Sequence, residues 1–379
     1  MTIFNKILAS LLLFVCVFDP QDQILGLKSV IFILLIAFTI ISGLYKSKIS
    51  INVDLLIYIL LFLFIPFIST LILFIRSFDV WLDLEWLSYL KTFAFLLFAI
   101  ILSSNNINLV NSFKKTLNIL ALSTILIFFI INLSPQLISV FLKVGNEIGS
   151  FAISFRDYKL IKFYNVYFHT SPLLIFNISY YSNELFNNKK INNFLWFFII
   201  YLAMLFSGTR NNIIFSTFII IFYFISHNKK YIIIMLLLVI FIFFSFKDIF
   251  NAMFSPNELS NKIKLSYLSD YFREYSDINT LFFGQGLGSK FFVKIHNTYI
   301  SNTELTYFEI FRRYGLFMGA LMIFLLYYPI IKFFKYSNFR WLIYAYTIYL
   351  LMIMTNPFFF SSNGIILLSI VLLINEYEK

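Results

Sequence analysis

The chain has 379 residues, of which 60% are hydrophobic and only 12% are charged, and its mean hydropathy is +0.87. This balance excludes an ordinary soluble globular domain and is typical of an integral membrane protein. The net charge of +11 is spread as basic pairs between apolar segments, which excludes a nucleic-acid-binding face and fits the charge pattern of membrane loops.

The apolar segments, taken in chain order, predict an all-α polytopic fold. A helix needs about 20 apolar residues to cross a bilayer, and about 17 are enough. On that criterion we expect about twelve spans in a single integral membrane domain, residues 1–379. The expected spans cover approximately 3–18, 24–44, 53–75, 87–103, 115–133, 171–187, 193–207, 212–227, 231–247, 315–333, 341–356 and 362–375.

The short loops predict the orientation, because lysine and arginine accumulate in the loops that stay in the cytoplasm. Alternate short loops carry the basic residues, so both termini are expected in the cytoplasm. Two longer segments, about 134–170 and 248–314, are then expected outside it, the second between the ninth and tenth spans. The basic loops contain Lys46 and Lys48, Lys114 and Lys115, Lys189 and Lys190, Lys229 and Lys230, and Lys332, Lys335 and Arg340.

Metal and cofactor motifs are not found in the sequence. The single cysteine, Cys16, lies in the first apolar segment, and the three histidines have no metal-ligand spacing. The glycines of the segment 284–288 form a GxGxG pattern, but the strand and helix of a dinucleotide-binding unit do not flank it. We therefore expect a tight turn there, and no metal or cofactor in the protein.

A first polar island, Ser207-Gly208-Thr209-Arg210-Asn211-Asn212, separates two apolar segments. Arg210 lies at the expected membrane boundary, where an unpaired charge costs several kcal/mol. Its guanidinium either binds an anion such as a phosphate or extends to lipid headgroups. The polar neighbours of Arg210 are expected to cap the next helix, and an anion site at that helix N-terminus is the alternative.

A second polar island extends from Gly284 to Gly315 and contains a histidine, two glutamates and paired arginines. Histidine is the residue type that can most readily exchange a proton near neutral pH, so His296 is either a proton acceptor beside Asn297 or a structural hydrogen-bonding residue. Glu304 is a second candidate base or a ligand of the acceptor sugar, ranked below His296.

Three charged residues follow at helical spacing in the same island. Glu309 is three residues before Arg312 and four before Arg313, which predicts a surface ion pair. The alternative is that the two arginines hold a diphosphate. Arg156, in the first long segment, is a weaker candidate for anion binding, and a solvated loop charge is the default interpretation.

The order of these parts resembles the Wzy-type O-antigen and capsular polysaccharide polymerases of the O-antigen ligase and polymerase superfamily. The motifs that carry the resemblance are SGTRNN at 207–212, FFGQGLG at 282–288, IHNTYI at 295–300 and ELTYFEIFRRYGLFMGAL at 304–321. The resemblance implies metal-independent, inverting glycosyl transfer from an undecaprenyl-diphosphate-linked glycan at the periplasmic face of a bacterial inner membrane. Arg210 would handle the lipid diphosphate, and His296 would lie near the reacting sugars.

We therefore expect a polysaccharide polymerase that transfers a growing glycan onto an incoming lipid-linked repeat unit. A ligase that moves the glycan to lipid A core is the first alternative, and a flippase for lipid-linked oligosaccharides is the second. Expected partners are lipid-linked glycans and membrane lipids, with a chain-length regulator and a repeat-unit flippase as further candidates. The predicted catalytic residues are His296, Arg210 and Glu304, and the predicted substrate-binding residues are Arg312, Arg313, Asn297, Arg156 and Glu309.

Overall fold

The computed structural model describes residues 2–24, 26–46, 52–76, 85–157, 162–188, 190–227, 259–336, 338–355 and 357–377. Most of these residues are helical, as the all-α prediction expects. The predicted ninth span, 231–247, and the first part of the second long segment lie outside the described residues.

The first part of the chain consists of apolar helices that coincide with the predicted spans. The predicted span 87–103 is divided in two by a turn at residues 95–96, and the helix predicted at 115–133 begins five residues earlier. The helices are α1 (Thr2–Phe18), α2 (Leu27–Lys46), α3 (Val53–Arg76), α5 (Glu85–Ala94), α6 (Leu97–Ser104) and α7 (Val110–Leu133).

The middle of the chain adds a short hairpin to the helices, in a segment predicted as a loop. Strands β1 (Phe151–Asp157) and β2 (Lys162–Phe168) pair antiparallel, with Phe151 opposite Phe168. Both strands are rich in aromatic residues, which favour a half-buried strand. The neighbouring elements are η1 (Pro135–Leu137), α8 (Ile138–Ile148), η2 (Ser171–Leu173), α9 (Leu174–Asn187), α10 (Ile191–Phe206) and α11 (Arg210–His227).

The last part of the chain places another helix and hairpin before the final apolar helices. Helix α16 consists of two helical pieces that meet at a kink at Gly315, where φ is 73° and where the predicted tenth span begins. The elements are α14 (Leu259–Tyr275), α15 (Ile278–Phe283), β3 (Phe291–Val293), β4 (Thr298–Ile300), α16 (Thr306–Phe333), α17 (Arg340–Met352), η3 (Ile353–Thr355), η4 (Pro357–Phe360), α18 (Ser362–Leu372) and α19 (Ile374–Tyr377).

Several helices have the length and composition of membrane spans. Within the described residues, five are long and apolar enough to cross a membrane: Leu27–Leu44, Val53–Arg76, Trp86–Ser104, Val110–Leu133 and Thr306–Phe333. Large apolar side chains cover their outer faces, as at Phe64 and Phe324, which are 55% and 53% exposed. The structure thus supports a membrane protein, and the number of twelve crossings stays a prediction.

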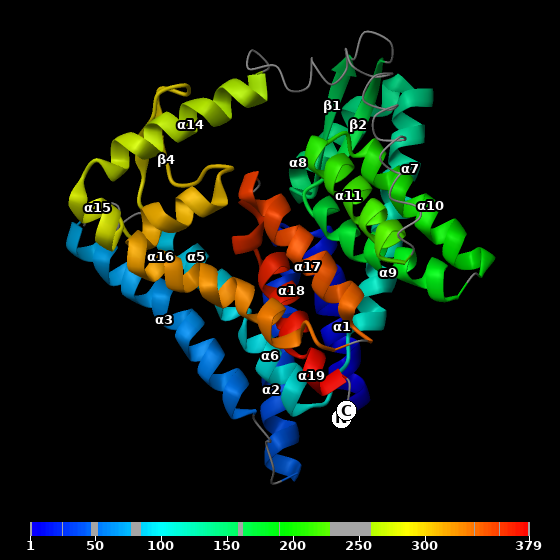
Figure 1. The fold of residues 1–379 in the computed structure, drawn as a ribbon, viewed down its shortest axis with the longest axis horizontal. Coiled ribbons are helices and arrows are strands. Elements are labelled where there is room, and N and C mark those ends of the chain that lie inside the picture. The colour runs from blue at the N-terminus through cyan, green and yellow to red at the C-terminus, as the bar shows by residue number, and fades with distance from the viewer. Residues whose placement is uncertain are drawn as a thin grey trace.

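The two long segments that were predicted on one side lie at the same end of the helical bundle. Figure 1 places both chain termini at the lower end of the view, and the β1–β2 hairpin and α14 at the upper end. One large apolar core joins the membrane-length helices. A smaller cluster, Tyr267, Tyr271, Phe291, Val293 and Leu305, holds α14 against β3 and the start of α16.

The GxGxG segment joins the kink of α16 to the apolar helix α3. The kink deprives the carbonyl groups of Arg312 and Arg313 of helical N–H partners, and the loop after α15 supplies replacements. The backbone nitrogens of Gln285 and Gly286 donate to these carbonyls at 2.7 and 3.1 Å. A Cβ atom on Gly286, whose φ is +97°, would lie 2.5 Å from Cα of Leu73. The predicted tight turn is therefore confirmed, and only glycine fits its closest approach.

Candidate functional site

Arg210 is the first residue of α11 and lies where the two long segments meet. Its Nη1 atom donates a hydrogen bond of 2.9 Å to Oδ1 of Asn261 on α14. On the other side, the amide of Asn165 in β2 donates to the carbonyl of Ser207 at 2.8 Å. The first polar island is therefore bound by elements of both predicted extracytoplasmic segments.

The other polar residues of this island connect α11 to neighbouring elements. The amide of Asn212 donates to the hydroxyl groups of Ser171 in η2 and of Ser207, at 2.8 and 2.9 Å. The amide of Asn211 donates to the hydroxyl of Thr355 in η3. Asn211 and Asn212 therefore connect helices, a role that the capping prediction did not include. Their bonds hold the N-terminus of α11 and Arg210 in place.

His296 is presented by the hairpin of β3 and β4. Residues 294–297 form its turn, and Asn297 adopts a positive φ of 49°, which asparagine tolerates better than most residues. The exposed imidazole places Nε2 3.0 Å from the hydroxyl of Tyr267 on α14. Burial raises the pKa of the Tyr267 hydroxyl, so this partner stays neutral and orients the ring.

Glu304 lies in the loop between β4 and α16 and also faces α14. Its Oε2 atom is 3.5 Å from Nζ of Lys264, and its side chain is 49% exposed. The residues of α14 that contact Arg210, Glu304 and His296 are Asn261, Lys264 and Tyr267, respectively. Each follows the previous one by three positions along the helix. With a rise of 1.5 Å per residue, the three contacts extend over roughly 9 Å of the α14 axis. The three predicted catalytic residues are therefore brought to one helix, α14.

The residues of α14 were missed because segment 248–314 was treated as a loop. A helical signal is present: Ile263, Tyr267 and Tyr271 recur at four-residue spacing. The two tyrosines belong to the small apolar cluster, and Ile263 packs against it. The polar residues Asn261 and Lys264 lie in the first two turns of the same helix, outside this apolar stripe. Their contacts with the predicted site depend on tertiary packing and have no sequence motif of their own.

The predicted ion pairs of Glu309 are present, but their predicted surface location is wrong. Oε2 of Glu309 is 2.8 Å from Nη2 of Arg312 and 3.1 Å from Nε of Arg313. The side chains of Glu309 and Arg312 are 3% and 0% exposed. Each guanidinium also lies over an aromatic ring, that of Phe291 for Arg312 and that of Tyr89 for Arg313. The kink of α16 and the surrounding loops enclose charges that spacing alone placed on a surface.

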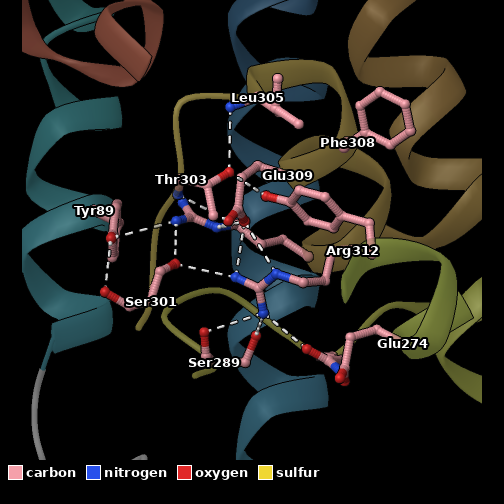
Figure 2. A network of polar contacts seen from close by, with 12 residues as sticks. Tyr89, Glu274, Ser289, Ser301, Thr303, Leu305, Phe308, Glu309 and Arg312 are labelled. Carbon is pink, nitrogen blue, oxygen red and sulfur yellow. Dashed lines mark hydrogen bonds and ion pairs between the residues drawn. The ribbon is translucent and has the colours of Figure 1, made fainter. Parts of the chain in front are cut away.

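The remaining donors of these arginines hold the loop that precedes α16 (Figure 2). Both Nη2 atoms donate to the carbonyl of Ser301, at 3.0 Å from Arg312 and 2.7 Å from Arg313. Oε1 of Glu309 accepts from the backbone nitrogen of Thr303 at 3.1 Å. The network therefore fixes the backbone immediately before Glu304.

This network leaves little room for a diphosphate at the paired arginines. Nη1 of Arg312 donates to the side chains of Gln285 and Ser289, at 2.8 and 2.7 Å. Arg313 lines a cavity of about 20 Å³, which is the size of one water molecule. Diphosphate binding by Arg312 and Arg313, and substrate binding by Glu309, stay predictions, and in this conformation a ligand would have to displace protein partners of the arginines.

Arg156 occupies β1, in the hairpin that packs against α7 and α8. The residue is half-buried, and its Nε atom is buried without a hydrogen-bond partner. The loop expected at this position is instead a strand. Among the described residues, no hydrogen bond joins Arg156 to the contacts on α14. Its predicted role in substrate binding is therefore separate from the site built on α14.

The described residues contain no group of three or more histidine, cysteine, aspartate or glutamate side chains that could hold a metal ion. A comparison with protein-family models gives no match, and a search of curated proteins finds no relative of the chain.

Proposed function

We propose that the protein is a membrane-embedded polysaccharide polymerase that transfers a growing glycan from undecaprenyl diphosphate onto an incoming lipid-linked repeat unit. One observation carries the proposal: α14 collects Arg210, His296 and Glu304 from three distant parts of the chain. A cation, an imidazole and a carboxylate held against one polar helix are the groups that such a transfer requires.

The arginine supplies charge stabilisation to the leaving group. The acceptor hydroxyl oxygen forms a bond to the anomeric carbon of the donor while the bond from that carbon to the diphosphate oxygen breaks. Negative charge develops on the departing lipid diphosphate, and a fixed guanidinium stabilises it without a covalent enzyme intermediate. Arg210 is positioned for this role because Asn261 holds its guanidinium at the start of α11.

His296 is the preferred base for the proton that the acceptor hydroxyl loses. One ring nitrogen of His296 contacts the neutral Tyr267 hydroxyl, and the ring lies on an exposed turn. The Glu304 carboxylate is instead engaged by the Lys264 ammonium group. Glu304 is therefore assigned to acceptor-sugar binding or to a secondary proton-accepting role.

We predict that Tyr267→Phe reduces polymer yield about fivefold at unchanged membrane abundance, because a typical hydrogen bond contributes about 1 kcal/mol. The phenyl ring keeps the packing of α14 and loses only the contact with His296. The matched control is Tyr275→Phe, which removes a hydroxyl on the same helix that donates to the carbonyl of Phe308. Equal yields from the two variants would argue against a positioning role for Tyr267.

The function is tested by deleting the gene in the native host and separating surface glycolipids and carrier-linked glycans on gels. For a polymerase, single repeat units still reach the acceptor and the ladder of longer chains disappears. Expression of the intact gene must restore the ladder. Accumulation of long carrier-linked chains would instead identify the ligase, which shares the donor and differs in the acceptor.

A flippase is the less favoured class. Transport sites generally lie near the membrane midplane, between the spans. The groups gathered on α14 come from a helix start, a hairpin turn and a loop, all in or beside the predicted extracytoplasmic segments. Loss of repeat units from the acceptor altogether in the deletion strain would favour the flippase.

A further inference from the structure

A second polar site lies at the other end of α7 from the hairpin. A cavity of about 490 Å³ opens between the N-terminal half of α7, the C-terminal half of α9 and the start of α10. This volume is in the range of small-molecule pockets, about 300–1,000 Å³. Lys114 of this cavity and Asn132, which contacts the hairpin, are separated by roughly 27 Å of helix. The cavity is therefore distinct from the site on α14.

A polar stripe on an apolar helix forms one wall of this cavity. Asn111, Lys114, Lys115 and Asn118 all line it and are spaced as neighbours on one face of α7. Both lysines lie in the second turn of α7, at its predicted cytoplasmic end, where basic residues can interact with anionic lipid headgroups. Glu184 is near enough to attract Lys114 electrostatically but does not line the cavity, and no carboxylate among the described residues does. The cavity is therefore positively charged.

This wall is held in place by the protein itself. Nζ of Lys114 lies 3.7 Å from the ring centroid of Tyr180, a cation–π contact that fixes the ammonium group. Asn118 donates to the hydroxyl of Tyr181 at 2.9 Å, and Asn177 donates to Oδ1 of Asn118 at 2.8 Å. The donors are thus preorganised, which lowers the entropic cost of binding a ligand.

The opposite wall adds amide donors and an aromatic ring. Asn192 and Asn193 lie in the first turn of α10, and Trp196 lies one turn later. Tryptophan and tyrosine are enriched where lipid headgroups meet the hydrocarbon region. The cavity thus combines two ammonium groups, several amides and aromatic rings.

We propose that this cavity binds the phosphate group of an anionic membrane lipid. The two lysines neutralise the phosphate, the asparagine amides donate to its oxygens, and the aromatic residues contact the glycerol and the first part of the acyl chains. A soluble phosphate ester offers the same chemistry, so the test must separate the two sources. The proposal does not depend on the polymerase activity.

The test uses the full-length protein purified in detergent and measures lipid binding by native mass spectrometry and by the shift in melting temperature. The probes are phosphatidylglycerol, phosphatidylcholine with the same acyl chains, and inorganic phosphate. The variant K114Q/K115Q removes both ammonium groups of the cavity. The matched control, K332Q/K335Q, removes two lysines near the C-terminal end of α16 that do not line the cavity.

We expect phosphatidylglycerol to bind the wild-type protein about tenfold more tightly than phosphatidylcholine, and K114Q/K115Q to lose most of this preference. The control should bind within about twofold of wild type. Binding of inorganic phosphate that depends on the same lysines, without a preference for the lipid, would assign the phosphate site to a soluble ligand and overturn the lipid. Equal phosphatidylglycerol binding by K114Q/K115Q and the control would overturn the site itself.

Discussion

Replacing Glu309 by glutamine is expected to destabilise the folded protein by about 3 to 5 kcal/mol, the largest stability effect that we predict. Glu309 is the only ion-pair partner that the described residues give to Arg312 and Arg313. Removing its charge leaves two buried guanidinium groups without a counter-ion. It also weakens the acceptor for the backbone nitrogen of Thr303.

The measurement is thermal unfolding of the purified full-length protein, with membrane abundance measured in parallel. Glu304→Gln is the matched control, because it removes a carboxylate five residues away whose ion pair with Lys264 is partly exposed. Exposed pairs contribute about 0–1 kcal/mol, so the control should melt close to wild type. If both variants melt alike, Glu309 is not the counter-ion that holds the two arginines.

The second large effect is expected for Arg210→Ala, which should lower polymer formation by a factor of about 100 to 1,000. The variant removes the fixed charge that stabilises the departing diphosphate and leaves α14 and the hairpins intact. Arg210→Lys should recover only part of the activity, since an ammonium group lacks the planar fork that binds two phosphate oxygens. The readout is the glycan ladder normalised to the amount of protein in the membrane.

Arg340→Ala is the control for the loss of an arginine at a helix start, because Arg340 is an exposed first residue of α17. It should leave the ladder unchanged. Asn261→Ala adds a second comparison, since it keeps the cation but removes the hydrogen bond that positions it. A normal ladder from Arg210→Ala would remove this residue from the mechanism, even if the protein remains a polymerase.

Local spacing predicted the partners of Glu309 but not their environment. Residues three and four positions apart lie on one face of a helix, so the ion pairs followed directly from the sequence. Whether that face meets solvent depends on what packs against it. Here three elements enclose the charges: the turn after α15, the β3–β4 hairpin and α5. Each is distant in sequence from Glu309 or separated from it by a loop.

Helix α14 illustrates a different case. Its apolar residues recur at helical spacing, but the many polar residues between them favoured a loop prediction. Its apolar stripe of Ile263, Tyr267 and Tyr271 is interleaved with lysines and polar residues, so its hydropathy is that of a surface segment. The helix is stabilised by packing on Phe291 and Leu305. Because these contacts are formed across the chain, the helix and its three site contacts could not be derived from composition.

The membrane-protein class and the positions of most apolar helices could be predicted from the sequence, because the length of an apolar segment is a local property that must match the thickness of the bilayer. The two polar islands could also be identified from the sequence, because their charged and polar residues interrupt otherwise apolar segments. The tertiary structure was needed to show that Arg210, Glu304 and His296 all contact one helix, α14, and that Arg312 is buried. The physical reason is that burial and side-chain partners depend on residues far apart in the chain, whose approach no local pattern encodes.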